Sequence, residues 1–191
     1  MNPGKINIVI KTIQVQGTSG FFMKSEHQPP EGEVQIREVR DGDREKIIAI
    51  FNHYAETSYA AYPEIPVNER FFAFLREGAL GFYVLESDAH IVGFGIMKPL
   101  LPFPVFMSTG MLTYFIQTDY TRRGLGKILL YRLTEDAKKM GMSSLVANMA
   151  SKNSASIRFH LQSGFTEVGR LHDAGSKFGE SFDLIWMQKM L

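Results

Sequence analysis

The stretch that decides the fold is Leu112-Thr-Tyr-Phe-Ile-Gln-Thr-Asp-Tyr-Thr-Arg-Arg-Gly-Leu-Gly-Lys127, in which an apolar strand leads into a basic turn with two glycines. After the turn, apolar residues recur at intervals of three and four, which is the spacing of one buried helix face. They are Leu125, Leu129, Leu133, Ala137 and Met140. The pattern predicts a strand, a turn and a helix, and Gly141 is expected to end the helix.

The turn at the start of this helix has the properties of a phosphate-binding site. The first N–H groups of a helix have no partner within it and carry partial positive charge. Gly124 and Gly126 allow an anion to approach the backbone closely. Arg122, Arg123 and Lys127 add full positive charges. The sequence therefore predicts that this turn binds phosphate.

Two common phosphate-binding motifs do not fit this turn. A P-loop requires a glycine where Thr121 stands and Ser or Thr where Ile128 stands. A dinucleotide-binding fingerprint requires a third glycine where Leu129 stands, and it normally follows the first strand of its unit. Taken alone, the glycine pair then indicates either a plain tight turn or a phosphate site of another family.

The bulk composition is that of an ordinary globular protein. The 191 residues are 45% hydrophobic and 21% charged, with a net charge of +1, and this length fits one domain. This balance indicates neither a nucleic-acid nor a membrane partner. The absence of cysteine excludes disulfides, thiolate metal ligands and a cysteine nucleophile. Because the first residues are too interrupted for a signal peptide or a membrane span, we expect a cytoplasmic protein.

Residues 1–32 are predicted to be an appendage to a domain that spans 33–191. Alternating apolar and polar residues between positions 6 and 15 indicate a strand. Residues 17–20 and 28–32 have the composition of a turn and a linker. The appendage can be a linker, an extra strand at the sheet edge, or an arm of a homodimer, since an exposed edge strand invites pairing.

Within the domain, hydrophobic periodicity and turn residues predict a mixed order of strands and helices. The expected strands cover residues 33–39, 81–86, 90–97, 110–117, 143–149, 165–170 and 181–187. The expected helices follow the N-cap region 41–43, span 68–76, begin at Leu125, and span 153–162 with Ile157 and Leu161 facing inward. Residues 99–104 form a proline-rich loop without regular structure, and Gly175 and Gly179 lie in the turn between the last two strands. The result is an α/β domain whose sheet is largely consecutive, with one strand-helix-strand crossover at the glycine turn.

The glycine turn and the segments after it together resemble the GNAT superfamily of acyl-CoA-dependent N-acetyltransferases. The segments are Arg122-Arg-Gly-Leu-Gly126, Asn153-Ser-Ala-Ser-Ile-Arg-Phe-His160, Ser163-Gly-Phe165, Gly169-Arg-Leu171 and Ala174-Gly-Ser-Lys-Phe-Gly179, followed by Asp183 and Trp186. They are most similar to the phosphinothricin and amino-acid acetyltransferase branch, and the likeness covers the chain from about Val34 onward. It implies the GNAT fold, a mixed central sheet of about six to seven strands flanked by about four helices.

By this likeness the glycine turn holds the pyrophosphate of coenzyme A through backbone amides. Acetyl-CoA is then the co-substrate, and no metal is implied. The strand that begins at Leu112 would pair with the pantetheine arm, and the helix that begins near residue 153 would contact the coenzyme beyond it. The residues implied to bind coenzyme A are Tyr114, Phe115, Ile116, Arg122, Arg123, Gly124, Leu125, Gly126, Lys127, Asn153 and Ser156.

Acetyl transfer to an amine requires a neutral amine, a polarised carbonyl and a proton for the departing thiolate. An aliphatic amine with a pKa of about 10 is mostly protonated at neutral pH, so a base is needed. The related branch has a glutamate on the central strand, where this sequence has Met111, which cannot act as a base. Glu56 or His53 on the first helix can substitute, or the amine loses its proton to solvent before it binds.

The remaining catalytic roles fall on the central strand and on a later helix. Backbone N–H groups near Phe115 and Ile116 are the candidates for binding the oxyanion. His160 stands where many GNAT enzymes have tyrosine and the phosphinothricin branch has histidine, so it is expected to protonate the thiolate. The alternative for His160 is plain packing between helix and sheet.

The expected acceptor pocket lacks the basic side chains that the related branch carries before its central strand. Leu101 and Phe103 occupy those positions and, with Met111, predict an apolar pocket. The alternative is that these residues only fill the core. Lys177 and Arg70 can still bind a carboxylate from elsewhere. The expected pocket residues are Phe103, Met111 and Lys177.

The sequence therefore predicts an enzyme that moves an acetyl group from acetyl-CoA to the primary amine of a small, rather apolar amine or amino-acid-like acceptor. Its expected catalytic residues are His160 and Glu56. Transfer to a protein or peptide N-terminus is one alternative. A coenzyme A binding module without catalysis is another, because the strand glutamate is missing. A nucleotide-binding domain that takes ATP or NAD instead is a third.

Overall fold

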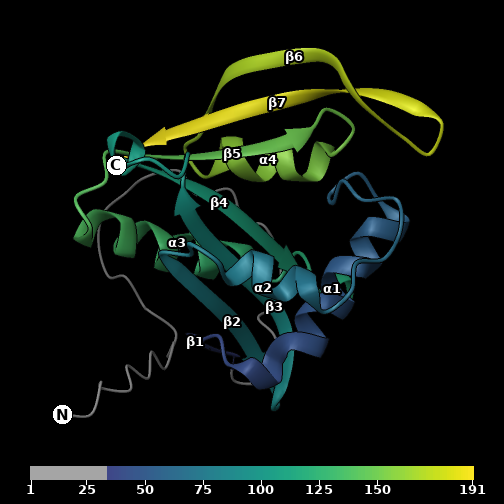
Figure 1. Ribbon diagram of the computed structural model, residues 1–191, viewed down its shortest axis with the longest axis vertical. Helices are drawn as coiled ribbons and strands as arrows, with labels where there is room; N and C mark the ends of the chain where they lie inside the picture. Colours follow the sequence, from purple (N-terminus) through teal and green to yellow (C-terminus); the bar gives the residue numbers. More distant parts are fainter. Residues whose placement is uncertain (1–33) are drawn as a thin grey trace, which may run out of the picture.

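The computed structural model describes residues 34–191, which form one seven-stranded mixed sheet with helices on both faces (Figure 1). The strands are β1 Val34–Glu38, β2 Gly81–Ser87, β3 His90–Pro99, β4 Thr109–Ile116, β5 Ser144–Ala150, β6 Thr166–Lys177 and β7 Glu180–Met190. The α-helices are α1 Arg44–Thr57, α2 Arg70–Arg76, α3 Leu125–Lys139 and α4 Ser154–Gln162. The short 3-10 turns are η1 Asp41–Asp43, η2 Pro104–Phe106 and η3 Thr118–Tyr120. The strand, turn and linker predicted within 1–32 lie outside the described residues.

The strand order is β1-β2-β3-β4-β5-β7-β6. Strands β4 and β5 are parallel and are joined through α3, which confirms the predicted crossover at the glycine turn. All other neighbouring strands are antiparallel. The last two strands exchange places relative to a consecutive sheet, because β7 pairs with β5 and leaves β6 at the edge. None of the helices within residues 34–191 is long and apolar enough to cross a membrane.

Several local predictions were wrong, each for a physical reason. The turn between the last two strands was predicted to contain both Gly175 and Gly179. Instead, β6 and β7 continue to a short turn at Phe178 and Gly179, both of which have positive φ. Gly175 therefore lies within β6, where a Cβ atom would collide with the ring of Phe182. Residues 104–106 of the proline-rich region form η2, a 3-10 turn that begins at a proline. Met140 is exposed because α3 ends before it, at Lys139, and Leu161 is exposed because α4 turns it toward solvent.

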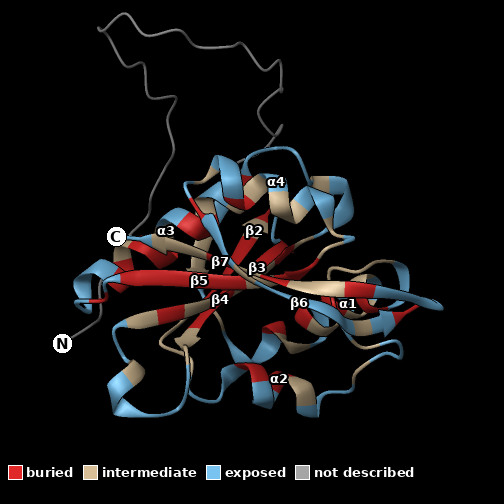
Figure 2. Ribbon diagram, turned by 90° about the horizontal axis from the view of Figure 1, so that it is seen from above, coloured by how far each residue is buried: buried red, intermediate tan, exposed pale blue. Residues whose placement is uncertain are grey.

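Two hydrophobic cores lie on opposite faces of the sheet, and Figure 2 shows the buried strands between α3 and α4 on one side and α2 on the other. Leu129 and Leu133 of α3 belong to the first core, and Phe94 of β3 belongs to the second, with α1 and α2. Consecutive residues of a strand point to opposite faces. Tyr114 of β4 therefore packs against the first core, while Phe115 belongs to the second.

The start of α1 is held to the sheet by a network of ion pairs. The Arg37 guanidinium donates hydrogen bonds to both carboxylate oxygens of Asp43, at 2.8 and 2.9 Å, and to Glu86 at 2.6 Å. The Asp43 carboxylate also accepts the backbone N–H of Arg40 at 2.7 Å. Asp43 is buried. The network therefore fixes where α1 begins relative to β1 and β2.

We expect Asp43→Ala to lower the free energy of unfolding by about 1–3 kcal/mol, because it leaves part of the Arg37 guanidinium and the Arg40 N–H unpaired. Urea unfolding followed by circular dichroism measures this change. Asp41→Ala in the same turn is the matched control: Asp41 pairs with Arg76 at an exposed position, so its loss should cost no more than about 1 kcal/mol. Equal costs for the two variants would contradict the role given to Asp43.

Candidate active site

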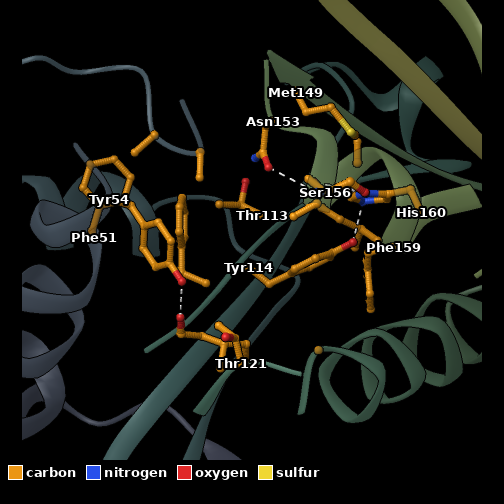
Figure 3. A pocket seen from close by; sticks show the side chains of 18 of the residues that line it. Phe51, Tyr54, Thr113, Tyr114, Thr121, Met149, Asn153, Ser156, Phe159 and His160 are labelled. Atoms are coloured by element: carbon orange, nitrogen blue, oxygen red, sulfur yellow. Dashed lines mark hydrogen bonds between the residues drawn. The ribbon is translucent and has the colours of Figure 1, made fainter. Parts of the chain in front are cut away.

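A cavity of about 1270 Å³ opens where β4 and β5 separate. The parallel pairing of these strands ends at Met111 and Val146. Beyond that point, residues 112–116 of β4 and 147–149 of β5 line the cavity. Figure 3 shows Phe51 and Tyr54 on one side of it, and Asn153, Ser156 and His160 on the other, with Tyr114 between them. The split of the sheet thus creates a candidate site in the described part of the chain.

The glycine turn forms one end of the cavity and has the backbone shape of an anion site. Arg122 and Gly124 have left-handed backbone conformations, with φ of 61° and 80°. The Lys127 N–H bonds the Gly124 carbonyl at 3.0 Å, so the amides just before it are the ones left for a ligand. Arg122, Arg123 and Lys127 are exposed around them. Strained backbone and clustered charge together suit a phosphate group.

The register of β4 decides which backbone groups face the cavity. The Gln117 N–H bonds the Val92 carbonyl at 2.8 Å, and Phe115 stands opposite Phe94. In an antiparallel pair, hydrogen-bonded and non-hydrogen-bonded residues alternate. The Phe115 N–H is therefore directed at β3, whereas that of Ile116 is directed away from it. Of the two N–H groups predicted to bind the oxyanion, the register leaves Ile116 and rules out Phe115.

Tyr114 and His160 form a hydrogen-bonded pair across the cavity wall. His160 lies on α4 and is only 3% exposed. Its Nδ1 atom lies 2.8 Å from the Ser156 carbonyl. Burial lowers the pKa of His160, partly offset by that hydrogen bond, and burial raises the pKa of the Tyr114 hydroxyl. Both groups are therefore neutral near pH 7.

The start of α4 is fixed by Asn153. Its side-chain oxygen accepts the Ser156 N–H at 3.1 Å, which confirms Asn153 as the predicted N-cap. Both residues line the cavity. The cap sets the first turn of α4 and so the position of the Ser156 carbonyl that orients His160.

The end of the cavity opposite α4 is walled by an aromatic cluster. It consists of Phe51, Tyr54, Phe71, Phe74 and Phe115. The Tyr54 hydroxyl donates to the Ile116 carbonyl at 2.5 Å, which ties α1 to the end of β4. Tyr62 adds a further ring, and its hydroxyl donates to the Asn148 side chain of β5 at 2.7 Å. None of the described residues that line the cavity is an aspartate or a glutamate.

The structure brings together every residue predicted to bind coenzyme A, since all eleven line this one cavity. Met111, predicted for the acceptor pocket, lines it as well. Phe103 does not: η2 turns it outward, and its side chain is 59% exposed. Leu101 is also exposed, and Arg70 is not a cavity residue. The pocket prediction was therefore wrong for the loop before β4.

The two acid–base candidates on α1 lie outside the main cavity. Glu56 is exposed and is not among the lining residues. His53 faces a separate cavity of about 340 Å³, where its Nε2 atom lies 2.8 Å from the Thr118 hydroxyl. The helix turns Phe51, Tyr54 and Ala55 toward the sheet and leaves His53 and Glu56 exposed. The structure thus corrects the catalytic prediction for Glu56.

Lys177 is not a pocket residue either, and its actual position is more informative. Its side chain is 1% exposed, and Nζ donates to the carbonyls of Ser58 and Ala61 at 2.7 and 2.6 Å. Burial lowers its pKa. Residues 60–63 line the cavity, and we call residues 58–63 the wall segment. Lys177 therefore acts on the cavity indirectly, by tying the wall segment to the end of β6.

The aromatic cluster was missed as a site from the sequence. Phe51, Tyr54 and Phe71 have the spacing of a core-facing helix stripe, and nothing in that spacing distinguishes a cavity wall from packed core. Phe74 lies three residues after Phe71, and only the structure shows that it stays exposed. Asn148 carried no signal, since its partner Tyr62 is far away in sequence.

Comparison with known proteins is consistent with this geometry. Residues 47–165 match the acetyltransferase (GNAT) family. The chain is 30% identical over 161 residues to a phosphinothricin N-acetyltransferase of Alcaligenes faecalis, covering 82% of each protein. It is 33% identical to an L-methionine sulfoximine/L-methionine sulfone acetyltransferase of Pseudomonas aeruginosa, covering 80% of this chain and 92% of that one. An acetyltransferase structure from Salmonella typhimurium with its cofactor acetyl-CoA superposes with a TM-score of 0.75 at 29% identity, covering 83% and 94% of the two chains.

We expect Lys177→Met to loosen the wall segment, because the two carbonyls lose their N–H donors while the side chain keeps its length. The free energy of unfolding should fall by about 1–3 kcal/mol, and amide hydrogen exchange in residues 58–63 should quicken. Urea unfolding and exchange mass spectrometry measure the two effects.

The matched control is Lys152→Met, in the same region. Lys152 pairs with Glu180 at the surface, so this change should cost clearly less than Lys177→Met. Unchanged exchange in Lys177→Met would argue against the tie between β6 and the wall segment.

Proposed function

The chain belongs to the acetyltransferase (GNAT) family and is an acetyl-CoA-dependent N-acetyltransferase; we propose that its acceptor is a small primary amine with a hydrophobic body and no negative charge. The observation that carries this proposal is the aromatic cluster at the end of the cavity opposite α4. Aromatic rings bind apolar bodies well, and a charged group would have to lose its hydration there without a partner.

The other end of the cavity suits coenzyme A. Its cations are Arg122, Arg123 and Lys127 on the glycine turn and Arg158 on α4. They can neutralise the phosphates, while the amides of the turn hold the pyrophosphate. The backbone of β4 beyond Met111 has lost its β5 partner and can pair with the amide groups of the pantetheine arm. The thioester then lies near Tyr114, between the turn and the aromatic cluster.

The acceptor side explains why a carboxylate is disfavoured. All four lining cations belong to the glycine turn or to α4, so the described residues offer the acceptor no basic partner. The named relatives act on phosphinothricin and on methionine sulfoximine, which are small amino-acid-like amines. We propose an acceptor of that size whose carboxylate is absent or masked.

The reaction needs groups that hold the oxyanion and move protons. We assign the oxyanion to the Ile116 N–H, because the β4 register directs it away from β3 and the amide requires no reorganisation. We assign proton transfer to His160. Peptide N-terminal acetylation is less favoured, since an acidic groove for a protein substrate would require carboxylates that the described lining residues lack.

The acceptor proposal is tested with two amines that differ at the carboxyl group, which is a carboxylate in phenylalanine and a neutral amide in phenylalaninamide. We expect kcat/KM for phenylalaninamide to exceed that for phenylalanine by at least about tenfold, equivalent to 1.4 kcal/mol of transition-state binding. Release of free coenzyme A thiol from acetyl-CoA measures both rates, and an alanine-terminated peptide is included for comparison. Equal rates for the matched pair would refute the uncharged acceptor, and preference for the peptide would favour N-terminal acetylation. Acetyl-CoA binding without thiol release on any amine would indicate a non-catalytic module.

The coenzyme site is tested at Lys127. Lys127→Met should raise the Kd for acetyl-CoA about tenfold, because it removes one charge-assisted hydrogen bond to phosphate. Isothermal titration calorimetry gives the affinity. Lys138→Met, near the other end of α3, is the control and should leave the Kd unchanged. Equal affinity of the wild type and Lys127→Met would remove Lys127 from the phosphate site.

A further inference from the structure

The cavity lacks an obvious proton acceptor. An ammonium acceptor with a pKa of about 10 must lose protons before and during transfer. No aspartate or glutamate is found among the described lining residues. Among these same residues, His160 is the one side chain whose ordinary pKa lies near neutrality. Among the lining side chains, His160 is therefore the candidate base.

The hydrogen bonds of His160 define which ring nitrogen carries its proton. The Ser156 carbonyl, 2.8 Å from Nδ1, is an acceptor only, so Nδ1 must be the protonated atom. Nε2 of the neutral ring is then an acceptor, and the Tyr114 hydroxyl donates to it. His160 is thus arranged as a base at Nε2, and not as the resting acid that its sequence position implies.

Nε2 is reached through Tyr114. The rings of Phe159 and Phe165 pack edge-on against the imidazole, with centroids 5.5 and 5.0 Å away. Both residues line the cavity, but His160 is almost fully buried, whereas Tyr114 is half-buried and lies on β4 beyond the split. Figure 3 shows the Tyr114 side chain extending from the middle of the cavity to His160.

We propose that Tyr114 is a further catalytic residue, whose hydroxyl passes protons between the reacting atoms and Nε2 of His160. This inference rests on acetyl transfer as the reaction and not on the choice of acceptor. It also gives the chain a proton path that does not need a carboxylate at the position of Met111.

The protons balance over one turnover. The amine loses one proton to solvent and attacks the thioester carbon, so a C–N bond forms and the carbonyl electron pair moves onto oxygen. The nitrogen gives a second proton to the Tyr114 oxygen while the tyrosine proton moves to Nε2. The oxyanion pair then re-forms the carbonyl and the C–S bond breaks. The thiolate takes a proton from Tyr114, which regains its own from Nε2, so both residues return to their starting state.

The surroundings of His160 set the direction of the pH dependence. The lining residues contribute cations from the glycine turn and Arg158 from α4, and tyrosines at positions 54, 62 and 120. Strand β5 contributes no titratable side chain to the described lining. Burial lowers the pKa of His160 below its ordinary value, and the hydrogen bond to the Ser156 carbonyl partly offsets this. Because the relay needs neutral His160, turnover should fall as the pH drops through that lowered pKa.

The experiment compares Tyr114→Phe, His160→Gln and the double variant with the wild type. Each single change should lower kcat about 100-fold without changing the Kd for acetyl-CoA. The double variant should lose no more than either single one, because both residues act in one path. Tyr131→Phe, an exposed tyrosine on α3, is the control and should keep full turnover.

Three results would overturn the relay. They are multiplicative losses in the double variant, a kcat for Tyr114→Phe close to that of the wild type, and a loss of turnover that tracks a loss of acetyl-CoA affinity. Nitrogen-15 NMR of the imidazole supplies an independent readout: we expect a protonated Nδ1 and an unprotonated Nε2, and the opposite tautomer would contradict the proposal. This measurement needs no substrate, so it tests the tautomer that the relay requires even when no tested amine is acetylated. Absence of acetylation would instead count against the proposed acceptor.

Discussion

The separation of β4 from β5 is the constraint on which the rest of the site depends. Parallel pairing ends at Met111 and Val146, although both strands continue. Backbone groups that face such a gap have lost their ladder partners, and a buried polar group left unpaired costs about 1–3 kcal/mol. A ligand with its own amide groups removes that cost. The same gap holds Tyr114, with the aromatic cluster on one side and the glycine turn at one end.

The strand, glycine turn and helix, with the anion-binding character of the turn, could be predicted from the sequence because their determinants are local. The glycines and cations of residues 122–127 and the apolar repeat after Leu125 fall within a few turns of chain. Asn153 likewise needs only the residue three positions later to act as a cap. Short-range patterns of this kind can be interpreted without knowledge of the tertiary structure.

The aromatic cluster, which we propose as the acceptor end, depends on contacts between distant segments, and local patterns could not identify it. Phe51 and Phe71 belong to different helices and meet with ring centroids 4.5 Å apart. Phe103 is close to β4 in sequence, yet η2 directs it to solvent. The exchange of β6 and β7 is a similar case, since each strand pattern was visible but their neighbours were not. The directions of the Phe115 and Ile116 N–H groups likewise depend on the register between β4 and β3, which the sequence does not show.

The contacts of Lys177 with the wall segment determine which substitutions that segment can accept. Its ammonium group binds the backbone carbonyls of Ser58 and Ala61, and every residue type supplies a carbonyl. Side chains in the wall segment can therefore be substituted while the backbone keeps its path along the cavity. Mutations in this segment can change the shape of the cavity without a change of fold.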